Sequence, residues 1–391
     1  MSRAVKKKRV SRSARKKSLW PVVLIIDDEE ESASAAKDKL EKQAESICRL
    51  PSDVTSADLN RADLVLVDYK LDHWPERDEQ KTPSLMPQDG NALVATLRSN
   101  LKYSSTRTPK AFALHSGQLS DLSGELSAVH REHAIARMQD LDWVFTKGIS
   151  AGDFGKEVRS LAFAVAALPR PWPTVEKSRE TLRSLLKLEK KSRWYIRATE
   201  DLEKGNPPQD VLAQTSHGMA VVRWLLHDVL PFPCFLIDER YLAARLHVTP
   251  KSLRLALSDP KSRRLRAALK EFAYTGILSS FSGSRWWRAG IEHWLWGKTN
   301  GQTFDSDALK SVVRQLSRRL VSLRQLNPVV TLDDQYRPTD VLIDLKKAVQ
   351  ISPDNWPTSA DPAWVSLEKA KKDPSVAARV TAQDRVKIGA E

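Results

Sequence analysis

Cysteine is scarce in this chain, and so are long apolar runs. Only two of the 391 residues are cysteines and eight are histidines, so neither a disulfide framework nor a zinc site is indicated. The longest apolar runs fall far short of the ~18 to 20 residues of a membrane span, and the basic N-terminus lacks the apolar core of a secretory signal. We therefore expect a cytoplasmic protein that has no contact with a membrane.

Several catalytic signatures are missing as well. We find no internal repeat, phosphate-binding glycine loop, kinase nucleotide site or hydrolase triad, and we expect that the protein is not an enzyme in the usual sense. The length exceeds what one core usually serves, and 41% of the residues are hydrophobic. That content is sufficient for two or more packed domains.

Charge is distributed unevenly along the chain. Residues 1–19 hold nine Lys or Arg and no acid, residues 20–169 carry a net charge of −7, and the remainder carries +12. The composition of 1–19 predicts a disordered basic tail. Such a tail either binds nucleic acid or an acidic partner by charge alone, or is a solvated leader with no fixed partner.

Four short apolar runs indicate a parallel sheet. They cover residues 22–26, 64–67, 111–114 and 143–145. Continuous rather than alternating hydrophobicity favours strands that are buried on both faces, as in a parallel sheet. In an open, doubly wound sheet the carboxyl ends of the strands line one crevice. A further strand between Cys48 and Val54 is hard to find.

Polar side chains follow each of these runs, namely Asp27 with Asp28, then Asp68, Ser116 and Lys147. A carboxylate such as Asp68 can accept a phosphoryl group and form an acyl phosphate. Asp27 and Asp28 offer the hard oxygen ligands that Mg²⁺ prefers. Lys147 and Ser116 would contact the phosphoryl oxygens. The pattern predicts an aspartyl-phosphate switch at the edge of the sheet.

Residues 20–169 resemble a response-regulator receiver domain, whose fold is a flavodoxin-like doubly wound α/β sheet. The matching pieces are Leu24-Ile25-Ile26-Asp27-Asp28-Glu29, Val65-Leu66-Val67-Asp68-Tyr69, Met86-Pro87-Gln88-Asp89-Gly90, His115-Ser116-Gly117 and Phe145-Thr146-Lys147. The resemblance implies Asp68 as phosphoacceptor, and Ser116 and Lys147 as switch residues. It also implies that Asp27, Asp28, Asp68 and the main-chain carbonyl of Lys70 hold Mg²⁺, and that a histidine kinase or related ATPase is the partner.

The sequence departs from the family pattern in three places. Residues 72–85 form an insertion after the acceptor strand, Gly148 stands where a proline usually follows the switch lysine, and Val144 stands where an aromatic usually precedes it. A polar insertion with one Trp predicts an exposed loop or lid. These departures leave open a second interpretation, a phosphorylation-independent adaptor that docks a partner ATPase or kinase.

Three prolines between Leu168 and Pro173 indicate the end of the first domain, because they break the preceding helix and stiffen the connection. We expect a basic, mainly helical output domain over 170–350, which begins with a helical stretch over 175–204. We expect a polar tail over 351–391. The oligomeric state stays open.

Residues 241–254 resemble a helix-turn-helix. Thr249 predicts an N-cap and Pro250 a first helical position, after a tight turn at His247 and Val248. Three side chains, Lys251, Ser252 and Arg254, would then face outward toward a DNA major groove. The alternative is that the two helices form only a packing module.

Residues 273–296 predict a wing, a hairpin around Ser282-Gly283-Ser284. It would offer Arg285 and Arg288 to DNA phosphates, and its tryptophans would stack on bases or lie in the core. A further helix over 305–326 places Arg314, Arg318, Arg319 and Arg324 largely off its apolar stripe.

Overall fold

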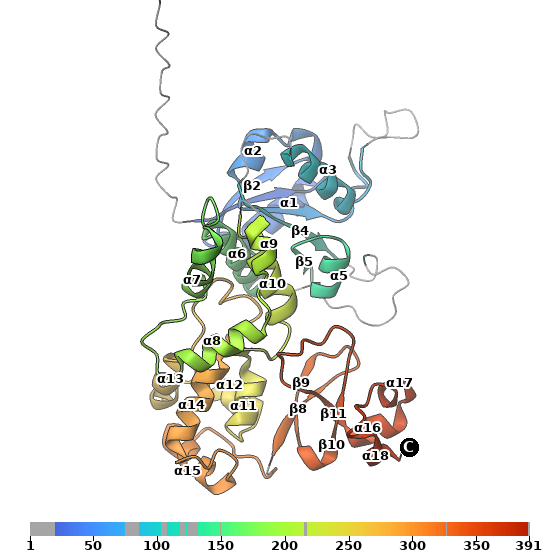
Figure 1. Cartoon of the computed structure of the whole chain (residues 1–391). Coiled ribbons are helices and arrows are strands. Elements are labelled where there is room, and N and C mark those ends of the chain that lie inside the picture. The colour runs from blue at the N-terminus through green and yellow to red at the C-terminus, as the bar shows by residue number, and fades with distance from the viewer. Residues whose placement is uncertain are drawn as a thin grey trace, which may run out of the picture.

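The protein is described from a computed structural model of the 391-residue chain (Figure 1). The structure describes residues 20–74, 86–102, 108–117, 122, 132–148, 150–214, 217–325 and 327–389. The predicted basic tail over 1–19 and residues 75–85 of the predicted insertion lie outside the described residues. None of the described helices combines the length and apolar character that crossing a membrane requires.

The first half is built on a five-stranded sheet. Its strands are β1 (Val22–Ile26), β2 (Glu45–Arg49), β3 (Leu64–Asp68), β4 (Ala111–Ser116) and β5 (Trp143–Thr146). Their order is β2-β1-β3-β4-β5, and every neighbouring pair is parallel. This order is that of a flavodoxin-like doubly wound fold, and it confirms the fold predicted for residues 20–169.

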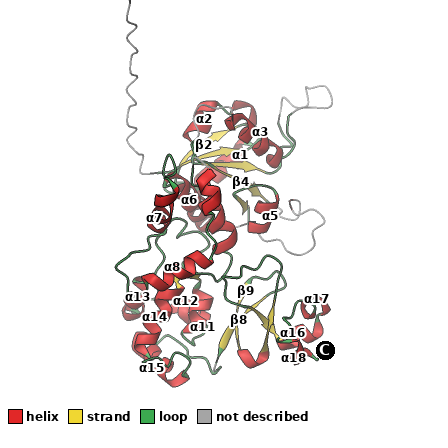
Figure 2. Cartoon of the chain, viewed as in Figure 1, coloured by secondary structure: helices red, strands yellow, loops and turns green. Residues whose placement is uncertain are grey.

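Helices cover both faces of this sheet (Figure 2). They are α1 (Glu30–Lys39), α2 (Ser56–Arg61), α3 (Gly90–Lys102), α5 (Glu132–Met138) and α6 (Ala151–Ala166). Successive side chains of a strand point to opposite faces, so Val23 and Ile25 of β1 enter one core, and Leu24 and Ile26 enter the other. The predicted burial of the strands on both faces is confirmed.

The second strand of the sheet lies mostly before the region between Cys48 and Val54, in which the sequence gives no clear strand signal. It is β2, whose five residues are all half-buried at the edge of the sheet. Its sequence, Glu-Ser-Ile-Cys-Arg, has no apolar run because only Ile47 and Cys48 pack on the cores, one on each face, and the strand is only half-buried at the edge.

The second half is mainly helical, as predicted. Its helices are α7 (Val175–Leu185), α8 (Tyr195–Lys204), α9 (Gln209–Gln214), α10 (Met219–Trp224), α11 (Glu239–Arg245), α12 (Pro250–Ser258), α13 (Arg263–Lys270), α14 (Arg288–Lys298) and α15 (Ser306–Leu316). A π-helical turn, Leu225–Val229, extends α10. The single helix predicted over 175–204 is wrong, because the chain leaves α7 through Lys187 at φ 56° and turns before α8 begins.

Helices α11 and α12 form the predicted helix-turn-helix geometry. Asp238 caps α11, and the Thr249 side chain accepts a hydrogen bond from the Ser252 N–H at the start of α12. Between them His247 adopts a left-handed backbone, with φ 51°. This is the conformation for which a turn of this kind often uses glycine.

The region predicted as a wing forms a small sheet. Strands β6 (Leu236–Ile237) and β7 (Trp286–Trp287) pair antiparallel, and Ala273 adds a bridge to Trp286. The loop between Ala273 and β7 does not project as a free hairpin. Its Phe281 is buried against aromatic rings of the first half of the chain, and one apolar cluster runs from one face of the five-stranded sheet into the helices.

The predicted polar tail over 351–391 is wrong. A four-stranded sheet of order β10-β11-β8-β9 occupies the end of the chain. Its elements are β8 (Pro328–Leu332), β9 (Pro338–Asp344), β10 (Ala348–Ile351), β11 (Ala363–Ser366), α16 (Leu367–Lys372), α17 (Pro374–Ala377) and α18 (Arg385–Ile388). Widely spaced apolar residues such as Val365, Val376 and Val380 build its core. The predicted helix over 305–326 is also too long, because Ser317 is extended after α15.

Candidate functional site

Three carboxylates meet at the carboxyl end of the five-stranded sheet. Asp27 and Asp28 follow β1, and Asp68 ends β3, the strand beside it. All three are buried, and one oxygen from each lies within 4.8 Å of the others. The sequence placed these residues together from the strand ends alone, and the structure confirms that they converge.

A cation and a hydroxyl complete the group. Lys147 follows β5, and its Nζ lies 2.6 Å from Asp68 Oδ1. Ser116 ends β4 and is buried, and its carbonyl accepts a 2.8 Å hydrogen bond from the Lys147 N–H. A backbone hydrogen bond therefore joins the two predicted switch residues.

The electrostatics of the site favour a bound cation. The pKa of Asp68 is raised to about 6, mainly by burial; the hydrogen bond from Lys147 opposes this rise, and the nearby charge of Asp27 contributes to it. Three buried carboxylates beside one ammonium leave excess negative charge, which a divalent cation would offset. Hard oxygen donors suit Mg²⁺. The residues present fit such an ion, with Asp27, Asp28 and Asp68 as its protein ligands; the part of the Lys70 carbonyl stays a prediction.

The backbone around Asp68 requires a glycine in the following helix. A Cβ on Gly90 would lie 2.1 Å from the Asp68 carbonyl oxygen. Without one, the Gly90 N–H donates a 2.8 Å hydrogen bond to the Tyr69 carbonyl, and Leu71 N–H donates to Gln88. The start of α3 thus fixes the end of β3 and the position of the acceptor carboxylate.

The beginning of the predicted insertion contacts the acids directly. The His73 backbone N–H donates a hydrogen bond to Asp28 Oδ2. The His73 ring places Nε2 3.3 Å from Glu29 Oε1. Leu71 and Trp74 are buried on either side of this turn. One oxygen of Asp28 therefore already has a partner within the chain.

His115 is a residue of this site that sequence reasoning missed. It directly precedes Ser116, is buried, and packs its ring 4.8 Å from that of Phe154 in α6. The pKa of His115 is lowered to about 3, mainly by burial and in smaller part by the charge of Lys147. A neutral imidazole thus separates the switch residues from α6. Its only sequence signal is its place beside Ser116.

The residues predicted to contact DNA from α12 differ in their exposure. Lys251 is exposed, as expected. Ser252 is buried, and its hydroxyl donates to the Thr249 carbonyl and accepts from the Val321 N–H. Arg254 is exposed but pairs with Glu239 and Asp340, which raise its pKa. The prediction that Ser252 faces outward is wrong, and two carboxylates occupy the Arg254 guanidinium.

The two arginines predicted on the wing are not available to phosphates in this conformation. Arg285 donates hydrogen bonds to the carbonyls of Leu230, Ser282 and Ser284, and burial lowers its pKa. Arg288 is 13% exposed and pairs with Asp201 and Asp361. The predicted outward orientation is wrong for both, because residue type alone does not reveal which charges are paired inside the fold.

The edge strand β5 joins the first half of the chain to the second. Trp143 packs its ring on His227 of the π-helical turn and on Phe281. Asp142, at the opposite end of β5 from Lys147, accepts a 2.7 Å hydrogen bond from Arg223 of α10. Arg137 of α5 pairs with Asp228 at 3.0 Å.

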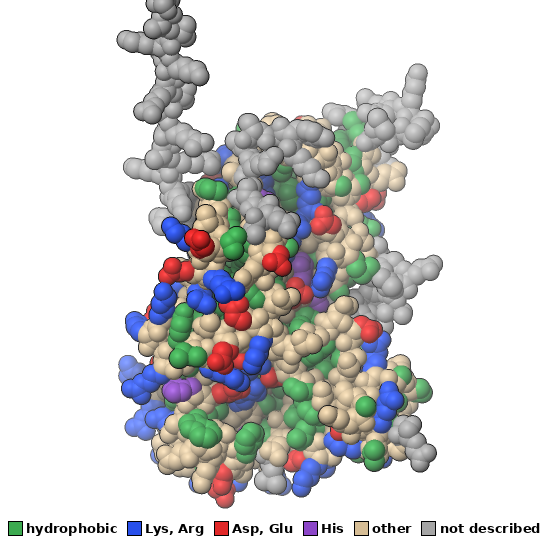
Figure 3. All heavy atoms as spheres, in the orientation of Figure 1, with side chains coloured by type: hydrophobic (Ala, Val, Ile, Leu, Met, Phe, Trp, Pro, Cys, Tyr) green, Lys and Arg blue, Asp and Glu red, His purple; other side chains and the backbone are tan. Residues whose placement is uncertain are grey.

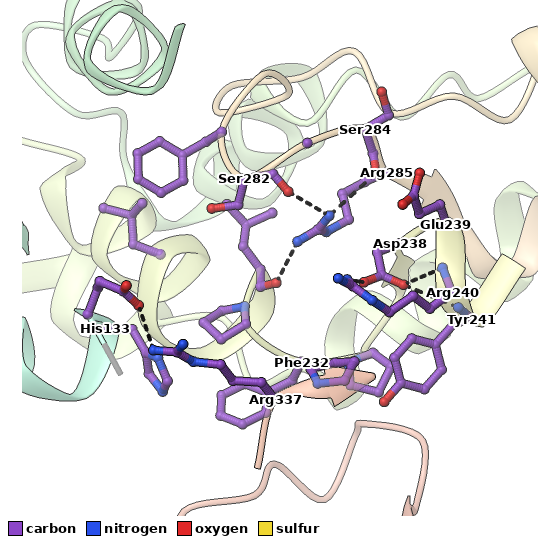
Figure 4. A pocket seen from close by; sticks show the side chains of 18 of the residues that line it. His133, Phe232, Asp238, Glu239, Arg240, Tyr241, Ser282, Ser284, Arg285 and Arg337 are labelled. Carbon is purple, nitrogen blue, oxygen red and sulfur yellow. Dashed lines mark hydrogen bonds and ion pairs between the residues drawn. The ribbon is translucent and has the colours of Figure 1, made fainter. Parts of the chain in front are cut away.

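A pocket of about 650 Å³ opens beside this junction (Figure 4). Arg285 points toward the carbonyls of its own loop, and Arg240 toward Asp238 at the start of α11. Arg337 reaches from the β8–β9 turn to Glu132 of α5, at 3.8 Å. The charged groups that line the pocket therefore pair largely with one another.

No family model and no curated protein matches this sequence. Among solved structures, the chain is similar to a response regulator receiver domain (CheY-like) from Methylobacillus flagellatus, with 21% identity and a TM-score of 0.26 over 36% of this chain and 98% of that one. It is also similar to a response regulator receiver domain protein from Clostridium thermocellum, with 16% identity and a TM-score of 0.25 over 37% of this chain and 93% of that one.

Proposed function

We propose that this protein is a response-regulator-like signalling protein in which Asp68 accepts a phosphoryl group. The observation that carries the proposal is the convergence of Asp27, Asp28 and Asp68 with Lys147 and Ser116 at one edge of the sheet. A histidine kinase or a small phosphodonor would supply the group. The protein would act as a switch and not as an enzyme in the usual sense.

The chemistry follows from these side chains. An Asp68 carboxylate oxygen attacks phosphorus, a P–O bond forms, and the bond to the donor's leaving group breaks with its electron pair. Lys147 exchanges its contact with Asp68 for the new phosphoryl oxygens, to which the Ser116 hydroxyl donates. A bound Mg²⁺ supplies positive charge that offsets repulsion between the acids and the phosphate. Burial of Asp68 limits water access to the acyl phosphate.

The signal would pass along β4 and β5. Phosphorylation adds roughly −1.5 to −2 charge, which draws Lys147 and Ser116 toward Asp68. Lys147 follows the strand that carries Trp143 and Phe145 against Phe281. A shift of β5 would therefore change how the second half of the chain sits on the first.

A phosphodonor labelling assay tests this proposal. We expect Mg²⁺ with a small phosphodonor to label the wild-type protein, and Asp68→Asn to remove the label. Asp72→Asn is the matched control, since Asp72 is an exposed carboxylate four residues along the chain. Equal labelling of Asp68→Asn, or no labelling of the wild type even with its kinase, would overturn the proposal.

Two contacts favour a second candidate, a phosphorylation-independent adaptor that docks a partner ATPase or kinase. The His73 N–H occupies Asp28 Oδ2, while Lys147 neutralises Asp68. A site satisfied by its own chain can keep the fold of a switch without its chemistry. The adaptor replaces the phosphoacceptor proposal under two conditions. The wild-type protein stays unlabelled by the phosphodonor, and the wild type and Asp68→Asn bind the partner equally well.

A further inference from the structure

A basic surface lies where α12, α13 and α15 meet. We define the basic surface as Lys251, Lys261, Arg263, Arg264, Arg314 and Arg318, all of which are exposed. In the view of Figure 3, Lys and Arg side chains gather along the lower left edge, where Figure 1 places α13. This surface lies outside the acceptor site, and of its members only Lys251 was expected to contact DNA.

Hydrogen bonds hold these element ends together. The hydroxyl of Ser262, which precedes α13, lies 2.8 Å from that of Ser317, which follows α15. A few residues along the chain, the Val321 N–H donates to Ser252 Oγ at the start of α12, at 3.1 Å. The segment after α15 therefore crosses the starts of both α12 and α13 and holds these element ends, which carry the exposed cations, close together.

The charges of this surface are not neutralised within the fold. In the part of the chain that the structure describes, no carboxylate lies within ion-pair distance of any of its six members. The nearby Asp259 pairs with Arg319 and accepts a hydrogen bond from the Lys261 backbone N–H, so its charge reduces that of Lys261 only in part. Arg245 in the same half differs, because it pairs with both Glu292 and Asp361. The positive field of the basic surface is therefore directed to solvent.

Helix stability does not account for these cations. Leu265 and Leu269 anchor α13 in the core, whereas Arg263 and Arg264 occupy its first turn. The N-terminal end of a helix carries partial positive charge, so cations there are unfavourable by a few tenths of a kcal/mol or more. Two arginines at this position cost folding energy, and an anionic partner would offset that cost.

We propose that the basic surface binds the phosphate backbone of a DNA duplex. The helices α12, α13 and α15 contain no aromatic residue that could serve as a stacking platform for single-stranded bases. A DNA duplex carries phosphates at regular intervals along both strands, and several cations without an acidic partner, spread over α12, α13 and α15, can contact more than one of them. The contact positions the protein without reading sequence. This inference goes beyond the proposed phosphoacceptor function and does not rest on it.

Anisotropy of a labelled DNA duplex of arbitrary sequence, titrated with the full-length protein between about 50 and 200 mM salt, tests the proposal. The first variant is Arg263→Gln/Arg264→Gln, and the second is Arg314→Gln/Arg318→Gln. Each removes two phosphate contacts, so we expect the slope of log K against log salt to become shallower by about 2 and the affinity to fall about tenfold or more. Unchanged melting temperatures will show that the fold is kept.

The matched control is Lys346→Gln/Lys371→Gln. It removes the same charge from exposed positions in the turn between β9 and β10 and in α16, and it should bind like the wild type. Equal losses in this control and in both test variants would mean that net charge alone governs binding and would overturn the proposal. Polyglutamate is the second control. If it binds as tightly as DNA, and if the two test variants lose the same affinity for it, the proposal is overturned in favour of an acidic protein partner. Asp68→Asn should leave DNA binding unchanged, so failure of the phosphoacceptor proposal is measured separately.

Discussion

Trp143 and Phe281 meet edge to face, with ring centroids 4.9 Å apart. Trp143 begins β5 and Phe281 belongs to the loop of the small β6–β7 sheet, so the contact joins two halves of the chain that are 138 positions apart. Lys147 follows the same strand at its other end. One short strand therefore carries both a residue of the acceptor site and the principal aromatic contact with the second half.

Removal of the Phe281 ring should weaken this junction. Phe281 is fully buried and touches Trp143 and Phe145, so Phe281→Ala should lower the free energy of unfolding by about 3 to 5 kcal/mol. Urea denaturation measures the change. Phe304→Ala is the control, because Phe304 is 81% exposed. Equal effects of the two substitutions would show that the ring makes no specific contribution.

Glu157 should make this junction sensitive to pH. Burial raises the pKa of Glu157 from 4.5 to about 7, although the Ser282 N–H, which donates to its carboxylate, lowers it. Between these values the folded protein keeps a proton that the unfolded chain releases. Stability should therefore fall as pH rises from about 4.5 to about 7, by on the order of 3 kcal/mol.

Glu157→Gln tests this expectation because the amide oxygen still accepts from Ser282 but does not titrate. We expect the variant to be more stable than the wild type above pH 7, and the difference to shrink toward pH 4.5. Thermal unfolding across this pH range measures it. A constant difference at every pH would assign the effect to packing.

The acceptor site was predictable because its residues follow apolar runs. Continuous runs at β1, β3, β4 and β5 showed where parallel strands end, and strand ends converge in this class of sheet. Edge strand β2 gave no such signal, since its residues are half-buried and mixed in polarity. The pairing of Asp142 with Arg223 had no signal either. Those residues lie 81 positions apart in the sequence.

In the second half of the chain, the sequence predicted features that depend on adjacent residues, such as helix starts. It did not predict features that depend on residues far apart in the sequence, such as the exposure of side chains. Thr249 and Pro250 marked the start of α12, because capping depends on adjacent residues. The exposure of Arg285 and Arg288 depends on carbonyls and carboxylates from distant elements. No sequence pattern carried that information. The small core of the last four strands escaped notice because its apolar residues are few and widely spaced.

Gly90→Ala should disrupt the backbone beneath the acceptor. A methyl group there would lie 2.1 Å from the Asp68 carbonyl oxygen, so either α3 or the end of β3 must move. We expect a loss of about 1 to 3 kcal/mol in stability, as for other overpacked sites, with slower phosphodonor labelling. The control is Gly297→Ala in α14, where nothing lies within 4 Å of the added atom; this change should stabilise the helix by roughly 0.5 to 1 kcal/mol. Destabilisation by both changes would point to a general intolerance of alanine and not to the clash.

Mg²⁺ should stabilise the protein through the buried acids independently of any phosphoryl transfer. An ion that binds only the folded state adds about 1.4 kcal/mol when its concentration is tenfold above its dissociation constant. The rise in melting temperature on addition of Mg²⁺ should be reduced in Asp28→Asn. Its amide can still accept from the His73 N–H, so this loop contact is kept. Glu30→Gln removes an exposed carboxylate two residues along the chain and should leave the rise intact. An identical rise in all three proteins would place the ion elsewhere on the surface.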